Sequence, residues 1–202
     1  MKKIKIETEV YNVPESWKDI SLKHYETFCD FIIENKINEI QLVSKVSSIP
    51  FTVLADLPLS FYTDILNTIL FIFQNIQYKP LSYIKDDEGN VYYVNTKEEL
   101  TLAQYVDIEN VYETESNENK LSEVLAICCL KKDEKYRTEL LEVRKEMFSN
   151  MSMDKLFPVL TFFLQLDRKL QKCIEIYSRI QERINKFQDS IKSSPKSGDG
   201  KN

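Results

Sequence analysis

The sequence predicts a predominantly α-helical α+β protein, with one N-terminal strand, one β-hairpin and a long C-terminal helix that carries heptads. Apolar residues recur at helical spacing through most of the chain, whereas residues 4–11 and 78–95 show strand-like patterns. From residue 166 onward, apolar residues step by four and three in turn. We therefore expect a helical domain over 1–165, a helical arm over 166–192 and a disordered tail over 193–202.

The composition argues against an enzyme. The chain has 202 residues, a formal net charge of −5 and three glycines, of which Gly89 alone precedes the last five residues. This count excludes a glycine-rich phosphate loop. With a single histidine, His24, we expect neither a multi-histidine metal site nor a histidine-centred triad. We therefore expect no catalytic residue, no metal and no cofactor.

The cysteines predict reduced, buried thiols rather than disulfides or a zinc site. The chain contains Cys29, Cys128, Cys129 and Cys173, and no two of them form a C-x-x-C pair. Cys128 lies in an apolar run, where burial raises the pKa of a thiol. The longest apolar stretches are too short for a spanning helix, so we expect no membrane insertion.

The N-terminal third predicts a strand followed by helices. Alternation over 4–11 indicates one strand, which Pro14 ends, and Trp17 anchors the connection after it. Ser21 is a candidate N-cap for a first helix. A second helix is expected to end before Pro50.

A short helical turn over 51–57 and a longer helix after Pro58 should follow. The apolar face of that longer helix is wide, so we expect it to be the most buried helix. Its apolar positions are Phe61, Ile65, Ile69, Phe73 and Ile76, flanked by Leu66, Leu70 and Ile72.

Residues 78–95 predict a β-hairpin around Gly89. The hairpin must pack on helices or on a partner, because a lone two-stranded hairpin is marginally stable. Tyr83, Tyr92 and Tyr93 are candidates for a protein contact surface. Stacking on single-stranded nucleic acid is the alternative, and the acidic surroundings argue against it.

The second half predicts more helices. Thr101 and Gln104 have the spacing of a capping box. The helix after them carries, at helical spacing, Leu102, Tyr105, either Ile108 or Glu109, and Tyr112. A short apolar helix is expected over 121–128 and a charged one over 133–148. In the charged helix, the residues expected to face inward are Tyr136, Leu140, Leu141, Val143 and Met147. A last helix begins near Met153.

The arm carries the sharpest pattern. Its heptad seam consists of Leu166, Leu170, Cys173, Tyr177, Ile180, Ile184, Phe187 and Ile191. The seam could pack on its own domain or pair with a helix of a second copy or of another protein. We favour pairing with a partner, because a domain of this size would struggle to cover so long a helix.

Charge is unevenly distributed. Residues 85–119 contain ten acidic and two basic residues, and residues 165–202 contain nine basic and five acidic residues. These blocks could be complementary patches, used on each other or on neighbours in an assembly, or ordinary solvated surface. Acid pairs such as Asp107 and Glu109 are not expected to act together, because residues two apart on a helix point in different directions.

The order of several segments adds a resemblance to a known group. The segments begin at Trp17 (WKDISLKHY), Gly89 (GNVYYV), Leu100 (LTLAQYVDIE), Leu125 (LAICCL) and Phe157 (FPVLTFF). Over residues 15–166 the chain resembles small proteins of tailed bacteriophages, notably tail assembly chaperone-like proteins and virion proteins of phages that infect Bacteroidetes, including the crAss-like group.

The resemblance implies a helical protein without catalytic residues that binds other virion proteins in the host cytoplasm during assembly. One alternative is a permanent component of the neck, tail or capsid, or a packaged protein, which would place the chain in the virion. A second is a protein that contacts nucleic acid through its basic arm, although nucleic acid is not the expected partner. Self-association through the C-terminal helix is also compatible with the heptads.

Overall fold

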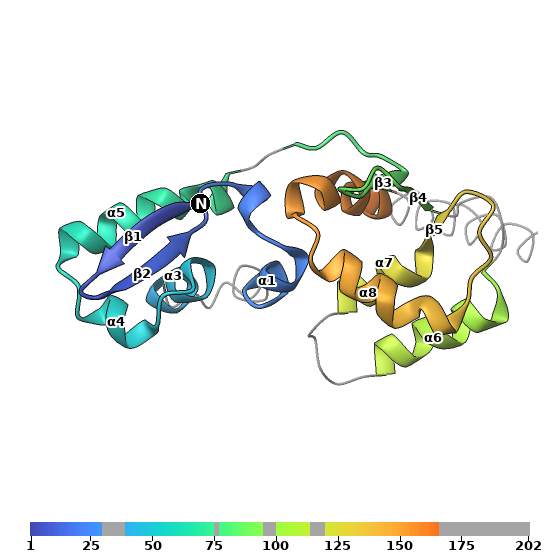
Figure 1. The fold of residues 1–202 in the computed structure, drawn as a ribbon, viewed down its shortest axis with the longest axis horizontal. Helices are drawn as coiled ribbons and strands as arrows, with labels where there is room; N and C mark the ends of the chain where they lie inside the picture. The colour runs from blue at the N-terminus through green and yellow to red at the C-terminus, as the bar shows by residue number, and fades with distance from the viewer. Residues whose placement is uncertain (30–38, 75–76, 95–99, 114–119, 166–202) are drawn as a thin grey trace, which may run out of the picture. The chain divides into compact units, whose positions relative to one another are not determined.

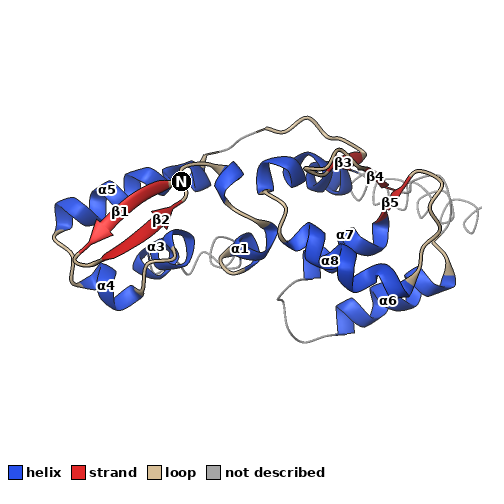
Figure 2. Ribbon diagram, viewed as in Figure 1, coloured by secondary structure: helices blue, strands red, loops and turns tan. Residues whose placement is uncertain are grey.

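The computed structural model describes residues 1–29, 39–74, 77–94, 100–113 and 120–165. The chain divides into two compact units, Met1–Thr161 and Phe162–Asn202. Helices predominate among the described elements, together with two small antiparallel sheets, so the predicted helical character is confirmed (Figure 1, Figure 2). In the second unit the described residues, 162–165, are helical. The predicted arm and tail lie outside the described residues.

The chain begins with two strands rather than the single one predicted. β1 (Lys2–Ile6) pairs antiparallel with β2 (Glu9–Val13), and Ile6 lies opposite Glu9. Glu7, the first residue of the two-residue turn, has a φ of 51°. The prediction of one continuous strand was wrong because this turn contains no glycine, proline or asparagine to mark it.

The predicted start of the first helix is confirmed. The hydroxyl of Ser21 accepts a hydrogen bond from the backbone N–H of His24 at 3.3 Å, and α1 (Leu22–Glu26) follows. The His24 ring nitrogen Nε2 lies 2.8 Å from the carbonyl oxygen of Lys45, in α3 (Glu39–Ser47). The histidine therefore joins two helices.

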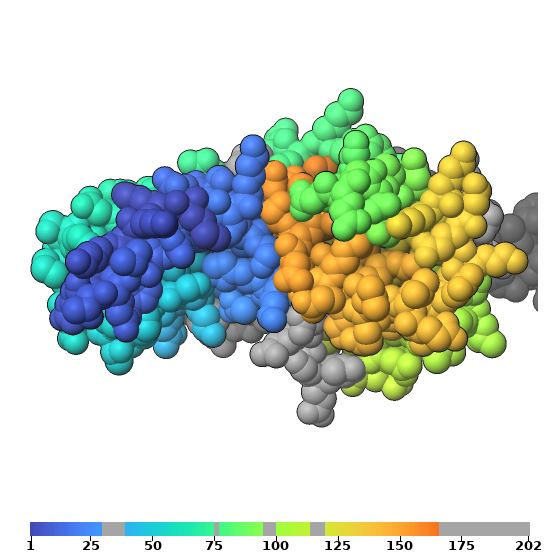
Figure 3. All heavy atoms as spheres, in the orientation of Figure 1, coloured from blue at the N-terminus to red at the C-terminus, as the bar shows by residue number. Residues whose placement is uncertain are grey.

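The predicted break before Pro50 is also confirmed. α3 ends at Ser47, and Ser48 has a φ of 58°. α4 (Phe51–Ala55) and α5 (Leu59–Ile69) follow, each directly after a proline. Both α3 and α5 contact β2, so the hairpin covers this group of helices (Figure 1). In the space-filling view the hairpin, in dark blue, is exposed on the near face (Figure 3).

The helix after Pro58 is less buried than its apolar pattern predicted. Ile65 and Ile69 are fully buried, as expected. By contrast, Leu70 is 43% and Phe73 is 50% exposed, both in the 3₁₀ segment η2 (Leu70–Phe73) that follows α5. The expectation that this would be the most buried helix was therefore wrong for one side of it, because the neighbouring elements do not cover the full width of its apolar face.

The predicted hairpin is present, and a third strand joins it. β3 (Tyr83–Lys85) pairs with β4 (Val91–Val94), and Gly89 adopts a φ of 89° in the turn. β4 also pairs antiparallel with β5 (Cys129–Lys131), so the sheet order is β3-β4-β5. The third strand gives the hairpin the support that two isolated strands lack.

α7 (Lys120–Cys128) packs against α1, α6 (Leu102–Glu113) and α8 (Leu141–Ser149). Its side chains Leu125, Ala126 and Ile127 are almost fully buried. The predicted short apolar helix is therefore confirmed, and it forms the centre of the second group of helices.

The predicted helix over 133–148 begins later than expected. Its helical part comprises the 3₁₀ turn η3 (Thr138–Leu140) and α8. Val143 is 72% exposed, whereas Phe148 is fully buried. Leu140 is 37% exposed. The inward assignments of Leu140 and Val143 were wrong, because the buried side of α8 is formed by Leu141, Arg144 and Phe148.

Residues from the start and the end of the first unit pair directly. The backbone N–H of Leu22 donates to the carbonyl of Met151 at 2.9 Å, and the N–H of Met153 donates to the carbonyl of Ile20 at 2.8 Å. A helix over residues 153–161 follows within this unit.

Trp17, in η1 (Trp17–Asp19), lies beside this pairing and is buried. Its ring makes edge contacts with Tyr25, Phe71 and Phe157, at centroid distances of 6.0, 5.3 and 4.8 Å. The anchoring role predicted for Trp17 is therefore confirmed.

Candidate protein-binding surfaces

α6 presents an apolar stripe to solvent. Leu102 is 78%, Tyr105 54%, Val106 46% and Tyr112 71% exposed. Their spacing places these four residues on one side of the helix. The sequence pattern is typical of a core-facing stripe, but the structure places this one at the surface.

The opposite side of α6 holds the helix in place. Gln104 is 1% exposed, and its backbone N–H donates to the hydroxyl of Thr101 at 3.3 Å, while its Oε1 accepts from the Thr101 N–H at 3.1 Å. The predicted capping box is therefore confirmed. The amide Nε2 of the same glutamine donates to the carbonyl of Ile127 at 3.0 Å, which ties α6 to α7.

Acidic residues accompany the apolar stripe. Glu109 and Glu113 are exposed and lie on the same side of α6 as Leu102. Asp107 points elsewhere, because its carboxylate accepts hydrogen bonds from Tyr136 at 2.6 Å and Thr138 at 3.1 Å. Burial and the bond to Asp107 raise the pKa of the Tyr136 hydroxyl well above its usual range.

We refer to the exposed side of this helix as the α6 face. Its residues are Leu102, Tyr105, Val106, Glu109, Tyr112 and Glu113.

The hairpin tyrosines divide between two faces of the sheet. Tyr83 and Tyr93 lie opposite each other, are 42% and 44% exposed, and have ring centroids 6.2 Å apart. Tyr92 is 6% exposed, and its ring lies 5.6 Å from that of Phe148. The expectation that Tyr92 belongs to a contact surface was therefore wrong, because neighbouring strand residues face opposite sides. Tyr83 and Tyr93 remain candidates.

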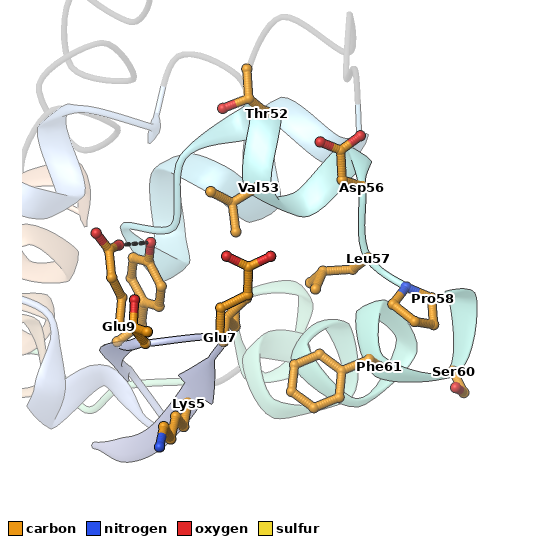
Figure 4. A pocket seen from close by; sticks show the side chains of 13 residues that line it. Lys5, Glu7, Glu9, Thr52, Val53, Asp56, Leu57, Pro58, Ser60 and Phe61 are labelled. Carbon is orange, nitrogen blue, oxygen red and sulfur yellow. Dashed lines mark hydrogen bonds between the residues drawn. The ribbon is translucent and has the colours of Figure 1, made fainter.

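A groove of about 690 Å³ lies between the β1–β2 turn and the α4–α5 segment. Its apolar lining includes Val53, Leu57 and Phe61. Figure 4 shows the Glu7 carboxylate pointing from the turn toward Val53 and Leu57, whereas Lys5 points away from the cavity. No pattern in the sequence indicates this groove, because it depends on the turn at Glu7.

A second acidic residue of the groove, Glu9, accepts a hydrogen bond from the Tyr11 hydroxyl. This bond raises the pKa of Tyr11. The groove thus combines an apolar lining with carboxylates, which favours a cationic or polar occupant over a purely apolar one.

Arg144, Cys128 and Cys129 lie inside the fold, where the arginine has bonding partners and burial affects the two thiols. Arg144 is 6% exposed, and its guanidinium lies 2.6 Å from Glu134 and donates to the carbonyl of Ala126 at 3.3 Å. Burial raises the pKa of Cys128 to about 11 and that of Cys129 further. The predicted rise in the pKa of Cys128 is therefore confirmed.

Two kinds of site are absent from the described ranges. They contain no group of three or more His, Cys, Asp or Glu side chains that could hold a metal ion. None of their helices combines the length and apolar character needed to cross a bilayer.

The arm residues predicted to bind a partner, Leu166, Leu170, Cys173, Tyr177, Ile180, Ile184, Phe187 and Ile191, lie outside the described residues. Their role therefore stays a prediction. No family model, curated protein or solved structure matches the chain.

Proposed function

We propose that this chain is a non-enzymatic assembly protein of tailed bacteriophages, similar to tail assembly chaperones, that binds other virion proteins through its helical and hairpin surfaces. The exposed α6 face carries the proposal. Full burial of one exposed large apolar side chain contributes roughly 1.5–3 kcal/mol. The four apolar side chains of the face are 46–78% exposed, so a partner that covers several of them gains a part of that free energy for each, before ordering costs.

Two further features support protein rather than nucleic-acid binding. Tyr83 and Tyr93 form an exposed aromatic pair, and tyrosine is enriched where proteins bind each other. The segment over 85–119, which includes both β4 and α6, has ten acidic residues against two basic ones. A segment with this net charge repels phosphate.

Site-specific photocrosslinking tests the proposal. A benzophenone amino acid replaces Tyr105 in the full chain, which is expressed in the phage's host during infection. We expect a covalent adduct with another virion protein. The same replacement at Val143, an exposed apolar position on α8, serves as the control and should give none. Equal adducts from both positions, or none from Tyr105, would contradict the role proposed for the α6 face.

Two measurements distinguish the alternative functions. Mass spectrometry of purified particles distinguishes a chaperone, which should be absent, from a permanent component, which should be present at fixed stoichiometry. Binding of the full chain to double-stranded DNA, with an affinity that falls steeply as salt rises, would instead favour a nucleic-acid role for the basic arm.

A further inference from the structure

We propose that the α6 face binds the arm, residues 166–192, of a second copy of this chain, so that copies associate head to tail. This inference rests on the proposed function, since it names a partner for the surface that carries it. Two observations support it: the charge of the two segments and the size of the face.

The charges of the face and the arm are complementary. Glu109 and Glu113 are exposed, and neither forms an ion pair among the described residues. The arm over 166–192 contains seven basic and four acidic residues. Its basic residues include Arg168, Lys172 and Arg179, which alternate with the apolar heptad positions. Opposite charges beside an apolar seam favour this pairing over a contact between two acidic faces.

The dimensions fit a contact between two helices. α6 has 12 residues, which corresponds to a length of about 18 Å. Its exposed apolar residues, from Leu102 to Tyr112, extend over most of that length. The sequence of the arm places an apolar residue every three or four positions, so twelve residues of the predicted helix would offer a stripe that matches the α6 face.

The face and the arm are different surfaces, so the contact is heterologous. Each copy that gives its arm to a neighbour still has its own face available for another copy, and the face of the last copy in an open assembly stays free for another virion protein. Such contacts build rings or open filaments, whereas a symmetric pairing of two arms stops at a dimer. This difference makes the proposal testable with full-length variants.

The experiment uses two variants of the full chain, one altered only in the α6 face and one altered only in the arm. The face variant carries Leu102→Lys and Glu109→Lys, both at exposed positions. The arm variant carries Ile180→Glu and Arg183→Glu. Light scattering after size-exclusion chromatography measures the mass of each protein and of their equimolar mixture at low salt. Circular dichroism confirms that each variant keeps the helical content of the wild type.

We expect the wild type to form assemblies whose mass rises with concentration, and each variant alone to remain monomeric. The mixture should give one-to-one dimers and nothing larger, because the face variant still supplies an arm and the arm variant still supplies a face. A matched control, Leu59→Lys with Asp64→Lys, makes the same charge change on α5, where Leu59 is 79% exposed. It should assemble like the wild type.

Several outcomes would overturn the proposal. They are a monomeric wild type at every concentration, a face variant that still assembles, a control that loses assembly, or a mixture that stays monomeric. If the wild type is monomeric while Tyr105 still crosslinks to another virion protein, head-to-tail association fails and the assembly role stands. If copies assemble as expected and Tyr105 crosslinks only to the arm of another copy, head-to-tail association stands and the binding of other virion proteins by this face fails.

Discussion

The side-chain amide of Gln104 donates to the carbonyl oxygen of Ile127 at 3.0 Å, so one buried glutamine both caps α6 and fixes it to the end of α7. Its carbonyl oxygen accepts the N–H of Thr101 at the same time. Because the polar core contact lies on this side of the helix, the apolar side that includes Leu102 and Val106 is directed to solvent. The α6 face therefore depends on an interior hydrogen bond.

Gln104→Ala should lower the free energy of unfolding by roughly 1–3 kcal/mol, because it removes a cap and leaves a buried carbonyl without its donor. Thr101→Ala removes the cap alone and should cost about 1 kcal/mol. Urea unfolding followed by circular dichroism measures both. Glu113→Ala, at an exposed position on the same helix, should have little effect. A smaller loss for Gln104→Ala than for Thr101→Ala would show that the bond to Ile127 contributes nothing.

Glu7→Gly should stabilise the protein by up to about 1 kcal/mol. Glu7 has a φ of 51°, a conformation that costs most residues roughly 1–2 kcal/mol and glycine almost nothing. The gain is reduced because glycine also makes the unfolded chain more flexible. Thr8→Gly is the matched control, since Thr8 does not have a positive φ, and it should destabilise. An equal loss of unfolding free energy in the two variants, measured by urea unfolding, would refute the strain at Glu7.

Arg144→Met should destabilise strongly, by up to roughly 3–5 kcal/mol, because it leaves Glu134 without its buried cation. The comparison is Lys145→Met, also on α8, which breaks a more exposed pair with Glu123 of α7. This change should cost about 1 kcal/mol or less. Thermal or urea unfolding measures both. Similar losses would mean that burial of Arg144 adds nothing to the pair.

The buried thiols predict a decline in stability at high pH. Burial raises the pKa of Cys128 to about 11, from 9.0 for an ordinary thiol. The unfolded chain therefore loses the proton first, and the free energy of unfolding should fall as the pH rises from about 9 to 11, with no effect below that range. Cys129 acts in the same direction.

Urea midpoints at pH 7, 9 and 10 test this prediction. Tyr62 and Tyr136, whose pKa values burial also raises, contribute a decline of the same sign at the upper end. The informative quantity is therefore the difference from a Cys128→Ser, Cys129→Ser variant, which should lose less stability between pH 9 and 10. An identical decline in both proteins would exclude the thiols as its source.

Features set by neighbouring residues could be predicted from the sequence. The cap at Ser21, the box of Thr101 and Gln104, and the helix end before Pro50 each involve residues within a few positions of one another. Their hydrogen bonds and backbone angles are determined locally, so a short stretch of sequence is enough to identify them.

Features set by residues far apart in the sequence could not be predicted. β5 is three residues long and owes its existence to pairing with β4, in which Lys131 lies opposite Tyr92. Tyr92 faces the core because Phe148 lies on that side of the sheet, so the sequence could not decide between Tyr92 and Tyr93. Similarly, the spacing in α6 predicts an apolar stripe but not whether anything covers it.

The ring of Trp17 joins segments that are far apart in the sequence, and it is the single tryptophan of the chain. Its indole emission therefore comes from one position, where the N-terminal helix, the η2 segment and Phe157 meet. Loss of any of these contacts will change the same optical signal. A comparison of that signal with the overall loss of helix will show, without any attached label, whether the first unit melts in one step or in stages.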